Sequence, residues 1–230
     1  MIKKRIAIIT ARGGSKRIPG KNKKDFLGKP IIAYSIEAAL NSGIFDEVMV
    51  STDDREISEI AEKAGAVVPF LRSDETSNDY ATTAEVILEV LNKYKEIGKE
   101  FEQVCCIYPT APFVTAVMLK EAMEALEKED TDCVIPVVKF SFAPQRSVVL
   151  TTDGKVEPKW PELMGKRSQD LEPFYHDCGQ FYCLRAKNFL EQRVLWMKRI
   201  TPYFQNEIRV QDIDTEEDWQ IAELKYRLIH

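Results

Sequence analysis

The 230-residue chain contains 44% hydrophobic and 30% charged residues and carries a formal net charge of −5, which disfavours nucleic acid as a partner. It has no apolar run near the roughly 20 residues of a membrane span and no secretory signal pattern, so we expect a cytoplasmic protein that does not bind membranes. Five cysteines without a C-x-x-C pair indicate reduced thiols, and only two histidines argue against histidine-based metal sites.

The first distinctive stretch is a basic loop that follows a short apolar strand, Ile6–Thr10. Its glycines give the backbone freedom to turn its amides toward a ligand, and its cations can neutralise phosphate. A solvated surface loop is the alternative, and it ranks second because glycines, cations and a buried strand coincide at the first strand end, where open α/β sheets bind ligands. Neither a Walker loop nor G-x-G-x-x-G matches, which disfavours kinase-type and dinucleotide-binding proteins. The basic residues are Arg12, Lys16, Arg17, Lys21, Lys23 and Lys24, and the glycines are Gly13, Gly14 and Gly20.

The next segments alternate between helix and strand signals, a pattern that predicts a parallel sheet with right-handed crossovers. Pro30 is expected at the start of the first helix, and Asn41-Ser42-Gly43 at its end. Thr52 or Asp53 is expected to cap the second helix. The predicted elements are a helix from Pro30 to about Leu40, a strand at 48–50, a helix through Ala64 and a strand at 66–68.

A polar loop at 71–80 precedes a helix that begins at Thr82 or Thr83 and runs to about Lys95. The strand at 104–107 then empties into a loop with two prolines, Pro109 and Pro112, which stiffen it into a wall of fixed shape. A helix at 116–127 and a strand at 133–138 complete this half of the chain.

The alternation breaks after residue 140. Residues 148–150 and 155–157 predict a hairpin with an Asp-Gly turn, and an apolar stretch around Trp160 follows. Without other information, this could be an ordinary meander on the sheet edge. The polar and aromatic stretches at 167–171 and 175–182 then return to strand.

Two carboxylates, Asp212 and Asp214, lie at alternate positions of a predicted strand end at 208–215. Period-two spacing would point them to the same side, where a hard cation such as Mg²⁺ would relieve their repulsion. Alternatively, Asp214 or Thr215 simply caps the helix predicted at 216–228, with Thr215 and Asp218 as a capping-box variant. Both interpretations can hold together.

Several of these motifs together resemble the acylneuraminate cytidylyltransferase family, and the resemblance covers nearly the whole chain. They are the basic loop Ala11–Asn22, the element Pro109-Thr110-Ala111-Pro112, the Arg167-x-Gln169-Asp170 run and Asp212-x-Asp214. The resemblance implies a single α/β domain over 1–230, with a Rossmann-like, GT-A-like nucleotidyltransferase fold and a mainly parallel sheet. It further implies that 140–175 is a dimerisation and sugar-site excursion in a homodimer.

The resemblance also assigns site residues. Asp212 and Asp214 would hold Mg²⁺, and Arg12, Lys21 and Asp214 would carry the catalysis. The nucleotide site would comprise Ala11, Arg12, Gly13, Gly14, Ser15, Lys21, Asn22, Arg72, Asp79, Thr83, Tyr108, Thr110 and Ala111. The sugar site would comprise Arg167, as carboxylate partner, with Gln169, Tyr175, His176, Asp177, Gln180 and Phe181. Tyr108 stands where acylneuraminate enzymes usually carry Gln, and His176 alone would be interpreted as a structural histidine.

The implied reaction joins CTP to an acidic nonulosonic sugar and releases pyrophosphate. The form of the 175–182 stretch favours the nine-carbon pseudaminic acid over N-acetylneuraminic acid, legionaminic acid and the eight-carbon Kdo. A non-catalytic nucleotide-binding protein on the same fold is an alternative, and the intact Asp212 and Asp214 pair argues against it. Nucleic-acid binding ranks third because of the net charge.

Overall fold

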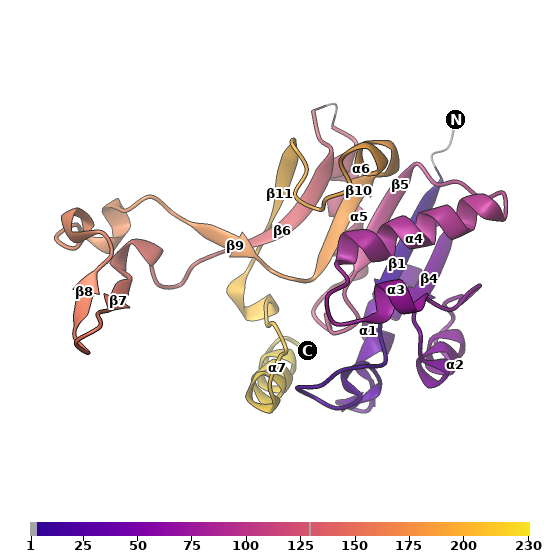
Figure 1. Ribbon diagram of the computed structural model, residues 1–230, viewed down its shortest axis with the longest axis horizontal. Coiled ribbons are helices and arrows are strands. Elements are labelled where there is room, and N and C mark those ends of the chain that lie inside the picture. The colour runs from indigo at the N-terminus through magenta and orange to yellow at the C-terminus, as the bar shows by residue number, and fades with distance from the viewer. Residues whose placement is uncertain (1–3, 129) are drawn as a thin grey trace.

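The computed structural model describes residues 4–128 and 130–230. Its centre is a mixed, mainly parallel sheet in the order β11-β6-β10-β5-β1-β4 (Figure 1). Strand β1 pairs in parallel with β4 and β5, whereas β10 runs antiparallel between β5 and β6, and β9 pairs with the end of β6. The strands are β1 (Arg5–Thr10), β4 (Glu47–Ser51), β5 (Gln103–Ile107), β6 (Cys133–Lys139), β9 (Tyr175–Asp177), β10 (Phe181–Arg185) and β11 (Ile200–Gln205).

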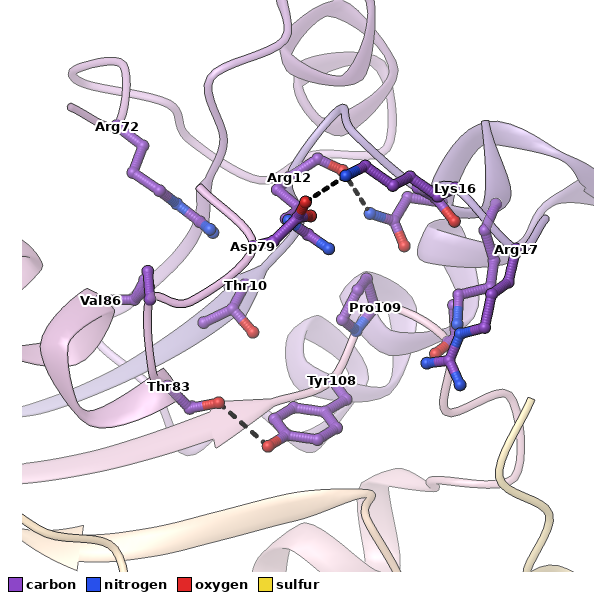
Figure 2. A pocket seen from close by; sticks show the side chains of 15 residues that line it. Thr10, Arg12, Lys16, Arg17, Arg72, Asp79, Thr83, Val86, Tyr108 and Pro109 are labelled. Carbon is purple, nitrogen blue, oxygen red and sulfur yellow. Dashed lines mark hydrogen bonds and ion pairs between the residues drawn. The ribbon is translucent and has the colours of Figure 1, made fainter. Parts of the chain in front are cut away.

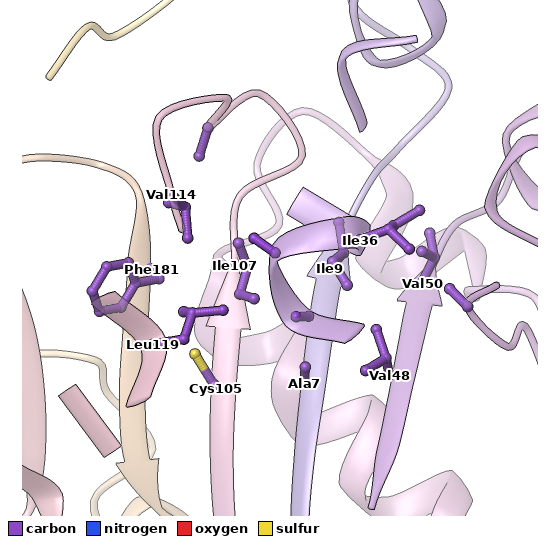
Figure 3. Close-up of a cluster of buried hydrophobic side chains, with 14 of the residues drawn as sticks. Ala7, Ile9, Ile36, Val48, Val50, Cys105, Ile107, Val114, Leu119 and Phe181 are labelled. Atoms are coloured by element: carbon purple, nitrogen blue, oxygen red, sulfur yellow. The ribbon is translucent and has the colours of Figure 1, made fainter. Parts of the chain in front are cut away.

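Helices cover both faces of the sheet. On one face α1, α2 and α5 pack on alternate residues of the strands, as Figure 3 shows for Ile9 of β1, Ile36 of α1 and Leu119 of α5. On the other face α4 and α6 cover the remaining residues, among them Ile8. The α-helices are α1 (Ile31–Ser42), α2 (Arg55–Lys63), α3 (Asp74–Ser77), α4 (Thr83–Glu96), α5 (Ala116–Leu126), α6 (Ala186–Gln192) and α7 (Glu216–Ile229). Within the described residues, no helix is both long and apolar enough to span a bilayer.

Local capping explains several helix boundaries. Thr82 and Thr215 each form a reciprocal capping box with the residue three positions later, and for Thr215 this confirms the predicted partner Asp218. The predicted cap of α2 was wrong by at least one residue, because Asp54 accepts the orphan amides of the first turn. The predicted strand at 66–68 is reduced to a single bridge from Val67 to Met49.

Helix α7 brings the end of the chain back to its beginning. Its Trp219 ring lies 5.5 Å from the ring of Phe26, which in turn lies 5.4 Å from Tyr34 of α1. Phe26 belongs to a small hairpin formed by β2 (Asp25–Phe26) and β3 (Lys29–Pro30), directly after the basic loop. This separate apolar cluster therefore fixes the residues before α7 beside the basic loop.

The segment 140–175 extends away from the sheet (Figure 1). Its predicted hairpin is confirmed: β7 (Val148–Leu150) pairs only with β8 (Val156–Pro158), and Gly154 takes the left-handed φ of 80° in the turn. All six hairpin residues are exposed, and Phe142 at the base is 90% exposed. The hairpin is thus not a meander on the sheet edge, and no core formed by the described residues covers it.

One buried charge makes the stability of the sheet depend on pH. Asp132, at the start of β6, accepts from Arg199 and Asn188, and these bonds lower its pKa to about 2. A depressed folded-state pKa contributes stability that is present above pH 4 and is lost as pH falls toward 2. We expect Asp132→Asn to lower the free energy of unfolding at pH 7 by up to about 2 kcal/mol, measured by urea denaturation. Between pH 5 and 3 the variant should lose less stability than wild type. Equal acid sensitivity of both proteins would contradict this role.

Candidate active site

A cavity of about 450 Å³ opens at the carboxyl ends of β1 and β5, where open α/β sheets bind ligands (Figure 2). Most of the predicted nucleotide residues line it. These are Arg12, Ser15, Lys21, Asn22, Arg72, Asp79, Thr83, Tyr108 and Thr110. The remaining lining residues are Thr10, Lys16, Arg17, Ala81, Val86 and Pro109.

Four cations of this cavity are paired with carboxylates, namely Arg12, Lys16, Arg17 and Lys21. Asp79 accepts from Arg12 at 2.6 Å and from Lys16, and these bonds lower the pKa of Asp79. Arg17 forms a two-pronged ion pair with Asp214, with both N–O distances at 2.7 Å. An entering polyphosphate would compete with Asp79 and Asp214 for these cations.

Arg72 is the most deeply placed cation of the cavity. It is 8% exposed, and its guanidinium donates to the side chain and the carbonyl of Ser51 at 3.0 and 2.5 Å. Burial lowers the pKa of Arg72, and the charge of Asp53 opposes that shift. Arg72 is therefore fixed in the wall of the cavity, and its remaining N–H groups are available to a ligand.

The glycines of the basic loop act differently from the prediction. Gly13 and Gly14 do not line the cavity, and the Gly13 amide donates to the Asp53 carboxylate at 2.9 Å. A β-carbon on Gly13 would lie 2.9 Å from that of Asp54, so close packing against the start of α2 explains this glycine. Ala11 and Ala111 are buried in the core, which leaves only their backbone for a ligand.

Gly13 therefore offers a sharp test with its neighbour as control. Gly13→Ala must displace the loop because the new methyl collides with Asp54, whereas a β-carbon on Gly14 meets nothing within 4 Å. We expect Gly13→Ala to raise the nucleotide KM by roughly tenfold or more, since small displacements of binding groups are costly. Gly14→Ala should stay near wild type in the same steady-state assay. Equal KM values for both variants would show that the packing of this loop is unimportant.

The segment that carries the two predicted metal ligands is not a strand. After the 3₁₀ turn at Glu207–Arg209, residues 210–214 have no neighbouring strand, and side chains satisfy the backbone carbonyls instead. The three long-range donors come from different parts of the chain. They are Gln180 to the Arg209 carbonyl at 2.6 Å, Lys225 to Val210 at 2.7 Å and Lys21 to Ile213 at 2.5 Å.

The two aspartates nevertheless interact, and they serve different cavities. Asp214 contacts the nucleotide-side cations Arg17 and Lys21, whereas Asp212 lines a second cavity of about 560 Å³. Desolvation, followed by the charge of Asp214, raises the pKa of Asp212. Two like charges of this kind favour a cation between them. Among the described residues, no group of three or more His, Cys, Asp or Glu is arranged for a metal, so an ion here would need ligand oxygens as well.

The second cavity contains three predicted residues: His176, Asp177 and Asp212. Tyr175 is next to it on β9. Gln180 is 2% exposed and instead holds the carbonyl of Arg209, as described above. Phe181 is fully buried in the core, so its predicted contact with a sugar was wrong, because β10 points this ring inward.

Two more predicted residues lie far from both cavities. Arg167 and Gln169 belong to the extended segment, at the 3₁₀ turn Ser168–Asp170, and line neither cavity. The Arg167 side chain is 75% exposed, and its guanidinium donates to Asp170 at 2.9 Å. This chain alone does not bring them to the site.

Several residues of the second cavity were not predicted. Lys139, Ser141, Glu207 and Lys225 line it, and they come from β6, the loop after it, the turn before Val210, and α7. No local sequence pattern indicates them, because long-range contacts bring them together: Lys225 of α7 donates to the Val210 carbonyl, and Glu207 lies beside the loop after β6. Ser141 and Glu207 are hydrogen-bonded to each other across this cavity.

Tyr108 lines the first cavity and is held by contacts with several elements. Its hydroxyl is 3.0 Å from that of Thr83 on the nucleotide side, and its ring lies 5.5 Å from the ring of Tyr182. Its backbone amide donates to the carbonyl of Gln180 at 2.8 Å, and its carbonyl accepts from Ser35. Four contacts therefore fix Tyr108 in the wall of the first cavity.

Comparisons with known proteins identify relatives of this chain in sequence and in fold. A sequence profile of the Cytidylyltransferase family matches residues 6–198. The chain is 40% identical over 227 residues to pseudaminic acid cytidylyltransferase of Campylobacter jejuni, covering 99% of this chain and 98% of that protein. It is 34% identical over 225 residues to CMP-N,N'-diacetyllegionaminic acid synthase of Legionella pneumophila, covering 95% and 94%. The solved structure of CMP:2-keto-3-deoxy-manno-octonic acid synthetase complexed with CTP superposes with a TM-score of 0.72 at 18% identity, covering 99% and 100%.

Proposed function

The chain belongs to the cytidylyltransferase family and is a nucleotidyltransferase that forms a CMP-sugar from CTP, and on this premise we propose that its sugar is pseudaminic acid. The higher identity to the Campylobacter jejuni enzyme than to the legionaminic acid enzyme supports this choice. The reaction would join the anomeric hydroxyl of the sugar to the α-phosphate of CTP and release pyrophosphate. We expect the protein to act in the cytoplasm, because CTP is a cytoplasmic nucleotide and its five cysteines are free, as is usual in that compartment.

One observation carries the assignment of the two cavities. The segment Asp212-Ile213-Asp214 lies where they approach each other, with Asp214 on the cations of the first and Asp212 in the wall of the second. A transferase must bring a phosphate and a hydroxyl together at one such junction. We therefore assign CTP to the first cavity and the sugar to the second.

The chain's own residues would then act mainly by charge and position. Arg12, Lys21 and Arg72 would hold the triphosphate and stabilise the charge that develops on it during in-line attack. Tyr108 and Thr110 would form the wall against the base, with Tyr108 in the position where related enzymes usually carry Gln. No covalent intermediate on the protein is needed for this transfer.

Asp212 and Asp214 fit a magnesium ion. Burial, followed by the nearby charge of Asp214, raises the pKa of Asp212, so a cation beside the two carboxylates would be favourable, and carboxylates with phosphate oxygens are the ligands Mg²⁺ prefers. When bound, Mg²⁺ would neutralise phosphate charge and make the sugar hydroxyl more acidic. The Lys21 contacts to Ile213 and Asp214 would keep both aspartates in place.

We also propose that two copies of the chain form a homodimer in which the segment 140–175 reaches the partner's sugar cavity. The exposed hairpin and the absence of Arg167 and Gln169 from the lining of both described cavities support this arrangement. Arg167 would then meet the carboxylate of the sugar bound to the other subunit. Light scattering of the purified protein tests the dimer directly.

The proposed function is tested by pyrophosphate release from CTP with a panel of acidic sugars. We expect pseudaminic acid to give the highest kcat/KM, and N,N'-diacetyllegionaminic acid, N-acetylneuraminic acid and Kdo to be poorer. Omission of Mg²⁺ should stop the reaction. A higher kcat/KM with another sugar of the panel would replace pseudaminic acid, and release with none of them would refute the assignment of the substrate class.

A further inference from the structure

The second cavity contains a carboxylate that is held unusually firmly for a residue at the end of a short strand. Asp177 closes β9, opposite Val137 of β6, and its Oδ1 accepts from the Gly179 amide at 2.8 Å. Its Oδ2 accepts from the hydroxyl of Tyr182 at 2.6 Å. Each oxygen of the carboxylate thus has one fixed donor from the protein.

Tyr182 has no other evident task in either cavity. It is 3% exposed, lies in the core between β5 and β6, and lines neither the nucleotide nor the sugar cavity. Burial raises the pKa of Tyr182, so the hydroxyl keeps its proton and remains a donor to Asp177. Its ring packs against Tyr108, which is anchored to Thr83 in the nucleotide cavity.

We propose that Tyr182 is a positioning residue that fixes Asp177 as the specificity determinant for a hydroxyl or acetamido N–H of the sugar. This inference rests on the proposed function. An ionised carboxylate only accepts hydrogen bonds, and with one acceptor site on each oxygen already taken, the remaining lone pairs select a donor. The sugar's own carboxylate is excluded from this position by charge repulsion. A fixed acceptor discriminates better than a free one, because a ligand without the matching donor leaves it unpaired.

The experiment compares single hydroxyl deletions in the same assay of pyrophosphate release. Tyr182→Phe removes the donor to Asp177 and the hydroxyl's contact with Tyr108, and it keeps the ring. We expect a sugar KM about tenfold higher, the usual cost of one hydrogen bond to a charged group, and an unchanged CTP KM because Tyr108 keeps its contact with Thr83. Asp177→Asn should lower kcat/KM for the sugar by about 100-fold or more. The variant replaces one carboxylate oxygen by an amide nitrogen, which cannot accept a hydrogen bond from a donor of the sugar. The matched control is Tyr203→Phe, whose hydroxyl contacts Glu121 outside both cavities, and it should leave both KM values unchanged.

A second readout identifies what Asp177 recognises. Sugar analogues that lack one hydroxyl or one acetamido group are compared on wild type and Asp177→Asn. For the analogue that lacks the recognised donor, the loss seen with wild type should largely disappear in the variant. The inference is overturned if Tyr182→Phe behaves like Tyr203→Phe, if it raises both KM values equally, or if every analogue loses equally on both proteins. All variants are compared on the sugar that wild type uses fastest, so these outcomes leave the substrate assignment intact.

Discussion

Replacement of Asp214 by alanine is expected to lower kcat for pyrophosphate release by at least about 1,000-fold, which corresponds to roughly 4 kcal/mol of lost transition-state stabilisation. Asp214 is the carboxylate that faces the nucleotide side, and without it Asp212 alone would have to hold the metal. CTP should still bind, because Arg17 and Lys21 lose a competing carboxylate and keep their place beside the cavity. Calorimetry with CTP separates this binding from turnover.

Glu216 provides the control for that experiment. It lies two residues further along, at the first turn of α7, and its carboxylate pairs with Lys24 at 2.6 Å without lining either cavity. Glu216→Ala removes the same charge from the same segment and should retain most of the wild-type kcat. Near-normal turnover by Asp214→Ala would remove this residue from the mechanism, and loss of CTP binding would assign it to the nucleotide instead.

Mixing two inactive variants is expected to restore activity if the segment 140–175 serves the partner's site. Arg167→Ala should raise the sugar KM steeply, and Asp214→Ala should abolish the transfer. A mixed dimer, however, has one site with both native residues, so an equimolar and fully exchanged mixture should recover about a quarter of wild-type activity at limiting sugar. Pyrophosphate release is measured after dissociation and reassociation of the two proteins.

The design contains its own control, since Asp212 and Asp214 belong to the same segment of one chain. A mixture of Asp212→Ala with Asp214→Ala has no intact site in any dimer and should stay inactive. If the mixture with Arg167→Ala stays equally inactive, Arg167 does not act across the subunits. If Arg167→Ala alone changes the KM of CTP and of the sugar equally, it is not the carboxylate partner.

Local signals accounted for much of the first half of the fold. The strand Arg5–Thr10, the basic loop and the helix caps at Thr82 and Thr215 follow from β-branched runs, glycines and side-chain oxygens within a few residues of one another. Helix α6 and strand β11 were not predicted. β11 is an edge strand with alternating exposure and a proline, and its pairing with β6 is a long-range property.

The site shows the same division between local and distant causes. Motif resemblance found most residues of the first cavity, because many of them lie on the loops that directly follow β1 and β5 and the others on the polar loop before α4 or at the start of that helix. It misjudged Gln180 and Phe181, whose roles depend on which side of β10 faces the core and on a carbonyl of residue 209. The strand predicted before α7 failed because Lys21 and Lys225, distant in sequence, satisfy its backbone.

The packing of α7 against the hairpin around Phe26 affects when the active site forms during synthesis and folding. Arg17 and Asp214 are 197 residues apart in sequence, so a nascent polypeptide emerging from the ribosome presents its phosphate-binding loop long before its aspartates exist. Closing such a distant contact is slow compared with forming the early strands and helices. The newly synthesised protein should therefore acquire its catalytic competence in a late step, when Trp219 reaches the aromatic side chains laid down at the beginning.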